Sequence, residues 1–198
     1  MQTLSFEIEG IAPFIMHNGR TANPLDPWAK AIKELTGIRK KTDETHQQIS
    51  DLEFLAGLYT VPTIFPGNIP ANARVVVPDF HIEASLLRGA RMIKSGKQFQ
   101  SGCFVNQTEL LDFPHKELGP TELIKRDEYR LVAAVNVGGK KVIRTRPCFQ
   151  NWKLRFTVKF NPEIILPAEV CQSVDLAGQQ CGMGSWRPKH GRFTFKQM

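Results

Sequence analysis

The amino-acid sequence predicts an α+β fold, and three of its features carry that prediction. Segments with the period of a strand alternate along the chain with segments that have the period of a helix. The 198 residues are enough to bury a substantial core. A composition of 41% hydrophobic and 23% charged residues is typical of a globular chain, and no apolar run is long enough to cross a membrane.

The N-terminal third is predicted to contain one strand and two helices. Residues 4–8 alternate between apolar and polar side chains, as in a half-buried strand. Pro27 suits the first position of a helix, and Asp26 before it suits the N-cap. A second helix is predicted from about Thr45. Residues 60–77 hold three prolines and are predicted to be an extended linker.

A third helix is predicted after Pro78, with Asp79 as its N-cap. Apolar residues at helical spacing give it one buried face, and Gly89 at the edge of that face is expected to pack closely on a sheet. Arg88 and Arg91 lie three residues apart and are expected to project from the opposite side.

The C-terminal half is predicted to hold most of the sheet. Residues 131–146 carry a Gly-Gly turn between two strand-like runs, which indicates a β-hairpin. Residues 152–160 alternate strictly and predict a strand with one apolar and one basic face. A fourth helix is predicted from Pro167 to a stop at Gly182, and residues 193–195 predict a last short strand.

Setting the two helices within residues 27–59 aside as an insertion leaves the order strand, helix, strand, strand, helix, strand. That order is typical of a ferredoxin-like or RNA-recognition-type sandwich, in which two helices cover one face of an antiparallel sheet. We therefore expect one such domain over residues 1–198, with a mainly helical insertion after the first strand.

The charge distribution favours an anionic partner. The chain has 26 basic and 19 acidic side chains, a net charge of +7, and residues 139–198 carry 11 basic and 3 acidic ones. Nucleic acid is the commonest large anion that such a basic half binds. A surface charge that only aids solubility is the alternative.

Cysteine and histidine give no sign of a metal site. The four cysteines lack the spacing of a zinc knuckle, and the five histidines are scattered. We therefore expect no metal and no cofactor. The N-terminus lacks a basic stretch followed by an apolar one, so we expect a cytoplasmic protein without a membrane partner.

The stretch Gly182–Phe193 combines three glycines, three cations, one histidine and one tryptophan. Glycine lets backbone N–H groups approach phosphates, cations neutralise them, and an indole can stack on a base. A dinucleotide-binding loop or P-loop is excluded, because those glycines lead from a strand into a helix and these follow a helix. The structural alternative is a helix stop followed by a turn with a core tryptophan.

The segments Val77–Arg91 and Gly182–Phe193 together resemble the RAMP superfamily of CRISPR-associated proteins. In that superfamily a proline-led segment enters a helix that ends in small residues and arginine, and a glycine-rich loop precedes the last strand. The resemblance implies a backbone subunit that polymerises head to tail along the guide RNA of an effector complex. It further implies an inserted thumb at 18–77, and partners that include other effector subunits and a complementary target strand.

The expected function is non-catalytic binding of single-stranded nucleic acid, most simply guide RNA. Cations, glycines and the tryptophan would form the interface. The residues expected there are Arg20, Arg39, Lys40, Lys41, Arg88, Arg91, Lys94, Arg144, Arg146, Gly182, Gly184, Trp186, Arg187, Lys189, His190 and Arg192.

Two alternatives remain open from the sequence. One is a metal-independent endoribonuclease, for which His17 and His190 are the candidate general acid or base. Some backbone subunits of the superfamily cleave target RNA with an aspartate after the first strand, where this chain offers only Asp26. The other alternative is a phage or plasmid single-stranded-DNA-binding protein, which would lack a preference for RNA.

Overall fold

The computed structural model describes residues 1–198, and the chain divides into two compact units. Unit 1 comprises Met1–Ile15, Val76–Pro114 and Phe149–Met198, and unit 2 comprises Met16–Val75 and His115–Cys148. Helices and antiparallel strand pairs occur together, so the predicted α+β class is confirmed. The segment expected as an insertion, 18–77, falls mainly in unit 2, but unit 2 also contains a second stretch that the sequence did not set apart.

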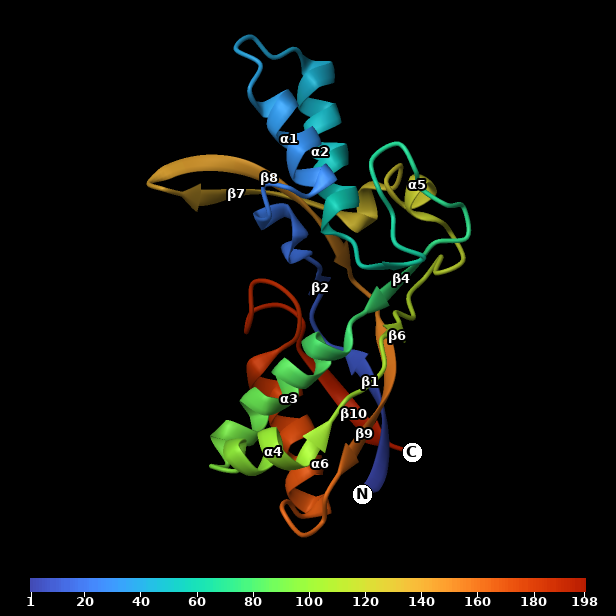
Figure 1. The fold of residues 1–198 in the computed structure, drawn as a ribbon, viewed down its shortest axis with the longest axis vertical. Helices are drawn as coiled ribbons and strands as arrows, with labels where there is room; N and C mark the ends of the chain where they lie inside the picture. The colour runs from blue at the N-terminus through green and yellow to red at the C-terminus, as the bar shows by residue number, and fades with distance from the viewer. The chain divides into compact units, whose positions relative to one another are not determined.

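A four-stranded antiparallel sheet forms the centre of unit 1 (Figure 1). Its strands lie in the order β10 (Phe193–Gln197), β1 (Gln2–Gly10), β9 (Lys153–Phe160) and β5 (Cys103–Phe104). The alternation seen in the sequence explains this arrangement, because it gives β1 and β9 one apolar face each. Phe6 of β1 is fully buried opposite Phe156 of β9, with ring centroids 5.6 Å apart.

Helices α3 (Asp79–Met92) and α6 (Pro167–Leu176) pack together on the apolar face of this sheet (Figure 1). Gly89 lies against the backbone of α6: a Cβ atom there would stand 2.1 Å from the carbonyl oxygen of Ser173. The expectation that Gly89 packs on the sheet is therefore wrong. It brings two helices together instead, as small residues do when backbones must approach closely.

The start of α3 also differs from the prediction. Pro78, not Asp79, is the N-cap residue, and it offers no side-chain hydrogen bond. The Asp79 carboxylate accepts a hydrogen bond from its neighbour, the Phe80 N–H, at 2.9 Å.

The C-terminal end of α6 passes into a π-helical turn, Ala177–Cys181. Gly182, with a φ of 68°, stops the helix there, as the sequence predicts.

Segments that the sequence left without structure contain short elements. The predicted linker 60–77 holds β3 (Thr60–Val61) and β4 (Arg74–Val77), which pair antiparallel through Thr60 and Val75. The region 95–128 holds α4 (Gly96–Gly102), β5, β6 (Glu109–Leu110), α5 (Pro120–Leu123) and the first part of a 3-10 turn at Asp127–Tyr129. Elements of two to seven residues have too few positions to show a period.

Unit 2 combines two helices with a β-hairpin. Helices α1 (Pro27–Thr36) and α2 (Asp43–Gly57) follow a 3-10 turn at Gly19–Ala22, and β2 (Phe14–Ile15) precedes them in unit 1. Strands β7 (Arg130–Val137) and β8 (Lys140–Phe149) form the predicted hairpin.

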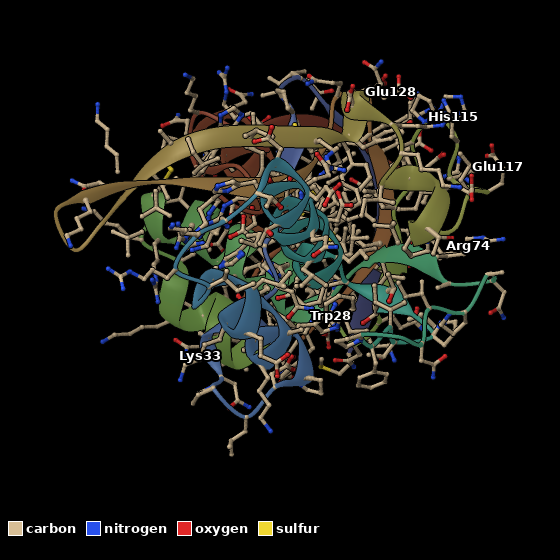
Figure 2. The ribbon with its side chains drawn as sticks, turned by 90° about the horizontal axis from the view of Figure 1, so that it is seen from above. Trp28, Lys33, Arg74, His115, Glu117 and Glu128 are labelled. Carbon is tan, nitrogen blue, oxygen red and sulfur yellow. The ribbon has the colours of Figure 1, made fainter.

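The core of unit 2 is built around the indole of one tryptophan. Trp28 of α1 is 1% exposed, and its Nε1 donates to the carbonyl of Ile64 at 3.1 Å. It points inward from α1, whereas Lys33 of the same helix is exposed (Figure 2).

The contact between α3 and α6 gives a stability prediction. Gly89→Ala should destabilise the protein by about 2 kcal/mol or more, because the added methyl meets helix backbone that cannot rotate away. Gly19→Ala is the matched control, since no atom lies within 4 Å of its added methyl and its φ is not positive. Denaturant unfolding of both variants checks this, and equal stability would contradict the close contact.

Candidate nucleic-acid interface

A row of exposed cations follows the outer side of α3. Arg88, Arg91 and Lys94 recur every three residues, and all three side chains are exposed. Arg91 and Lys94 share a hollow of about 280 Å³ with Lys97 of α4, a residue that the sequence reasoning missed. None of these four cations pairs with a carboxylate.

The glycine-rich loop adds a further cation beside this row. Burial, and then the charge of Arg88, lower the pKa of Arg187. Burial and the charge of Arg187 also lower the pKa of His81, near the start of α3. These mutual effects mean that the loop and α3 present one positive region. We call Arg88, Arg91, Lys94, Lys97 and Arg187 the α3–loop cluster.

The glycines of the loop have a different role from the one predicted. Gly184 has a φ of 79°, and a Cβ there would lie 2.5 Å from the carbonyl oxygen of Ile15. A Cβ on Gly182 would lie 2.4 Å from the carbonyl oxygen of His190. Both positions therefore require glycine for the packing of unit 1 itself.

Backbone donors of the loop are also used within the protein. The N–H groups of Gly182 and Ser185 donate to the carbonyls of Ala177 and Ile15. The N–H of Gly191 donates to Pro13. An anion-binding nest of loop N–H groups was expected here, but Gly182 and Gly184 serve the loop's shape instead.

Trp186 is the tryptophan of the glycine-rich loop. It is half-buried, in contrast to Trp28 and Trp152, which are each 1% exposed. The alternative of a core tryptophan therefore does not describe this residue. Its ring lies 6.2 Å from that of His190, and the neighbouring Lys189 is exposed, as is Arg192 at the end of the loop.

The basic face predicted for strand β9 is partly neutralised in the structure, because two of its three cations pair with glutamates and Lys159 does not. Arg155 Nε pairs with Glu7 Oε2 at 2.6 Å, and Lys153 Nζ pairs with Glu9 Oε1 at 3.3 Å. Both glutamates come from β1, whose register places them directly opposite the cations. The unpaired cations that remain on the open face of the sheet are Lys159 of β9 and Lys196 of β10.

Arg20 has a structural role, which corrects its place among the nucleic-acid-binding residues. Its guanidinium donates to the carbonyl oxygens of Ala56, Ile64 and Leu58 at 3.1, 3.1 and 2.9 Å. It also donates to Leu55 and lies 5.4 Å from the ring centroid of Trp28. A phosphate would have to displace these contacts, which hold the end of α2 in place.

Asp26 is the N-cap of α1, as predicted from its place before Pro27. Its carboxylate accepts from the Trp28 N–H at 2.8 Å. This hydrogen bond accounts for the residue without catalysis. The other expected cations of this region, Arg39, Lys40 and Lys41, lie in the connection between α1 and α2, where Lys41 donates to the Ile38 carbonyl at 2.7 Å.

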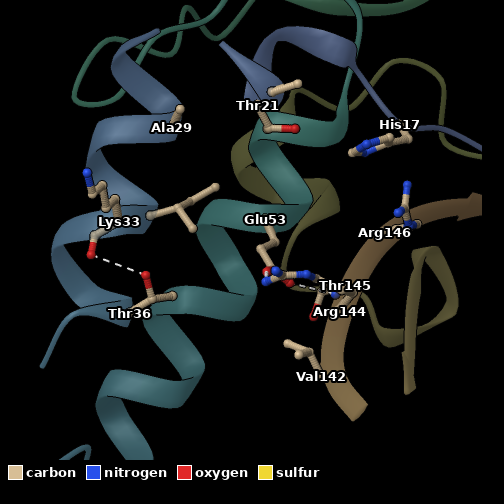
Figure 3. A pocket seen from close by; sticks show the side chains of 12 residues that line it. His17, Thr21, Ala29, Lys33, Thr36, Glu53, Val142, Arg144, Thr145 and Arg146 are labelled. Carbon is tan, nitrogen blue, oxygen red and sulfur yellow. Dashed lines mark hydrogen bonds and ion pairs between the residues drawn. The ribbon is translucent and has the colours of Figure 1, made fainter. Parts of the chain in front are cut away.

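A cavity of about 500 Å³ lies inside unit 2, between α1, α2 and β8 (Figure 3). His17 and Arg146 face each other across one end of it. Arg144 lines it too, paired with Glu53 Oε1 at 2.6 Å. Glu53 is a residue that the sequence reasoning missed, because an acid in a polar helix carries no signal of a cation 91 positions away.

The two candidate catalytic histidines belong to different units of the chain. His17 belongs to unit 2 and His190 to unit 1. Burial lowers the pKa of both, so each is neutral at neutral pH. Neither histidine lies within ion-pair distance of a carboxylate that would orient its ring. His115 of unit 2 has such a partner, because its Nδ1 lies 3.5 Å from Glu128 Oε1 (Figure 2).

Histidine, cysteine and acidic side chains do not gather in groups of three or more that could hold a metal ion. No helix of this structure combines the length and the apolar character needed to cross a membrane.

The surroundings of His17 predict a pH effect on stability. Burial, Arg146 and Arg144 lower its pKa from 6.5 to about 4. The unfolded chain therefore binds a proton more readily than the folded one, and stability falls as the pH drops from 6.5 through 4. His17→Gln should lose less stability than the wild type over this window in denaturant unfolding. In this variant His81 and His190 still make the free energy of unfolding depend on pH. If that dependence were as steep as in the wild type, the effect assigned to His17 would be contradicted.

Comparison with known proteins adds no relative from which function could be transferred. No protein-family model and no curated protein matches this chain. Its function must therefore be inferred from its own residues, above all from the α3–loop cluster.

Proposed function

We propose that this protein binds single-stranded nucleic acid, in the first place guide RNA, through the α3–loop cluster of unit 1. The observation that carries the proposal is the contrast between two sets of cations. On the open face of the sheet Lys153 and Arg155 pair with glutamates, although Lys159 and Lys196 do not, whereas all five cations of the cluster have no carboxylate partner. Unpaired cations in a row are the electrostatic footprint of a phosphate backbone.

The fold of unit 1 supports a ferredoxin-like sandwich as part of the proposal. Numbering only the strands of its sheet along the chain, β1, β5, β9 and β10 become 1 to 4, and the order across the sheet is 4-1-3-2. All neighbours are antiparallel, with α3 between the first two strands and α6 between the last two. This is the split βαβ arrangement on which the predicted sandwich depends.

Binding would be electrostatic and independent of sequence. Arg88 and Arg91 lie one turn apart on α3, and Lys94 follows the end of that helix, so the three cations can contact phosphates without reading base edges. Trp186, half-buried in the loop next to Arg187, offers a face on which one base can stack. No proton transfer is needed, which agrees with a non-catalytic subunit.

Assembly belongs to the same proposal. A backbone subunit of the RAMP type would bind a guide strand head to tail with copies of itself, with residues 18–77 as the thumb. A heterologous interface of this kind gives an open arc or filament whose length follows the RNA. Other effector subunits and a target strand would be its further partners.

The proposal predicts that two substitutions on α3 weaken the binding of RNA. The double variant Arg88→Gln with Arg91→Gln should bind labelled single-stranded RNA more weakly than the wild type. Because two phosphate contacts are lost, the slope of log affinity against log salt should become shallower by about 1.4. Fluorescence anisotropy over a range of salt concentrations measures both quantities.

The matched control removes the same charge from the open face of the sheet. Lys153→Gln with Arg155→Gln should leave affinity and salt slope close to those of the wild type, because both cations are already paired. If both double variants lost the same RNA affinity, the loss would result from the change in net charge and not from the position of the cations. A full wild-type affinity of the first variant would overturn the assignment, and equal binding of DNA would favour a single-stranded-DNA protein.

A further inference from the structure

Three cations of the α3–loop cluster surround one hollow at the junction of α3 and α4. The hollow has a volume of about 280 Å³ and is lined by Arg91, Lys94, Gly96, Lys97 and Gln100. Helix α4 lies beside the end of α3, and both belong to unit 1 (Figure 1). The three cations and the glutamine are exposed, so the hollow is open to a ligand from solution.

A tight turn between the two helices brings these cations together. The Lys94 N–H donates to the Arg91 carbonyl at 3.2 Å, and the Ser95 N–H donates to the Ala90 carbonyl at 2.9 Å. The two hydrogen bonds form a Schellman motif, whose left-handed position is most often glycine because glycine has no Cβ. Lys94 occupies that position with a φ of 62°. The chain therefore carries a cation where local backbone energetics favour glycine.

Contacts with the rest of unit 1 hold this turn in place. Ser95 is 4% exposed, and its Oγ donates to Glu169 Oε1 on α6. Phe99 of α4 is buried in the core. Lys97 and Gln100, one turn apart on the same short helix, are left on its exposed side. The left-handed conformation of the turn is thus imposed by the fold, and the lysine adds nothing to it.

Gly96 determines where the Arg91 side chain lies. A Cβ atom on Gly96 would stand 2.6 Å from Cγ of Arg91. The φ of Gly96 is not in the left-handed region, so backbone conformation does not require glycine there. The absence of a side chain instead leaves room for the aliphatic stem of the arginine. Arg91 is thereby held against the start of α4, at the hollow.

The hollow collects positive charge, and none of its lining residues is acidic. Glu169 anchors the turn but does not line the hollow, and its Oε2 accepts from the Leu166 N–H at 3.0 Å. An internal phosphodiester carries one negative charge and two unesterified oxygens, which is less than three cations and an amide can engage at one point. A phosphate monoester offers three such oxygens and a charge of about −1.5 to −2 near neutral pH.

We propose that this hollow binds the terminal phosphate of a nucleic-acid strand. The inference rests on the proposed function, because the rest of the strand lies along the α3–loop cluster. Arg91, Lys94 and Lys97 neutralise the monoester, and the Gln100 amide supplies a neutral donor. In an assembly of several copies, one copy meets the end of the strand and sets the register for the others. A monoester at the 5′ end and one at the 3′ end have the same chemistry, and the experiment separates them.

Three single-stranded RNAs of one sequence test the proposal with the full chain. One carries a 5′-phosphate, one a 3′-phosphate, and one a hydroxyl group at both ends. Displacement of a labelled reference strand measures the affinity of each. At least one phosphorylated strand should bind about tenfold more tightly than the hydroxyl strand, and the preferred strand identifies the end. Equal affinities of all three would overturn the end site and leave the proposed function in place. Failure of all three to bind would overturn the proposed function itself.

The ratio of the affinities of the phosphorylated and hydroxyl strands shows whether the hollow causes the preference. Lys97→Gln should reduce a tenfold ratio to about threefold or less, because one charge-assisted contact with the monoester is lost. Arg88→Gln is the matched control. It removes a cation of the same cluster outside the hollow, so it should weaken both strands alike and keep the ratio. A ratio that survives Lys97→Gln, or that falls equally in Arg88→Gln, would refute the assignment.

Lys94→Gly separates binding from stability. Glycine adopts a φ of 62° without strain, so the midpoint of thermal unfolding should stay the same or rise. The preference for the phosphorylated strand should nevertheless fall, as in Lys97→Gln, because a cation of the hollow is lost. A lower midpoint would contradict this account of the turn. An equally stable variant with an unchanged preference would contradict the assignment of the terminal phosphate to the hollow.

Discussion

The close contact of α3 with α6 is the constraint on which the rest of unit 1 depends. Gly89 allows the two helix backbones to meet, and Ser85, one turn earlier on the same buried face, donates from Oγ to the carbonyl of Gly182 at 3.0 Å. The loop is thereby fixed to α3 at its first residue. Because of that attachment Arg187 lies beside Arg88, and a glycine-rich stretch becomes part of a positive surface.

Pairing of charges, more than their number, distinguishes the surfaces of this protein. In β9 every second residue is polar or basic, yet register with β1 gives two of its cations a glutamate each. In unit 2 the guanidinium of Arg130 is held by Asp51 at 2.7 Å, and Arg144 by Glu53. The cations of α3 and α4 have no such partner. Out of a net charge of +7, the charges that we assign to phosphate binding are those of α3, α4 and Arg187.

Local signals predicted much of the fold, and long-range contacts account for what they missed. The cap at Asp26, the Gly-Gly hairpin and the strand 153–160 follow from neighbours in sequence, and all are present. The role of Arg20 could not be predicted, because its carbonyl partners lie 35 to 44 positions away. The same holds for the partly neutralised face of β9, whose partners are about 148 positions away. Likewise, no local pattern shows that Gly184 faces the Ile15 carbonyl instead of a ligand.

The most direct test of the central claim is to locate the bound strand on the protein. Photo-cross-linking of single-stranded RNA that carries a photoreactive uridine, followed by peptide mapping, identifies the residues in contact. The account predicts cross-links to the loop Gly182–Phe193, at Trp186 above all, and to α3 and α4. Cross-links confined to the open face of the sheet, on β1 and β9, would contradict it.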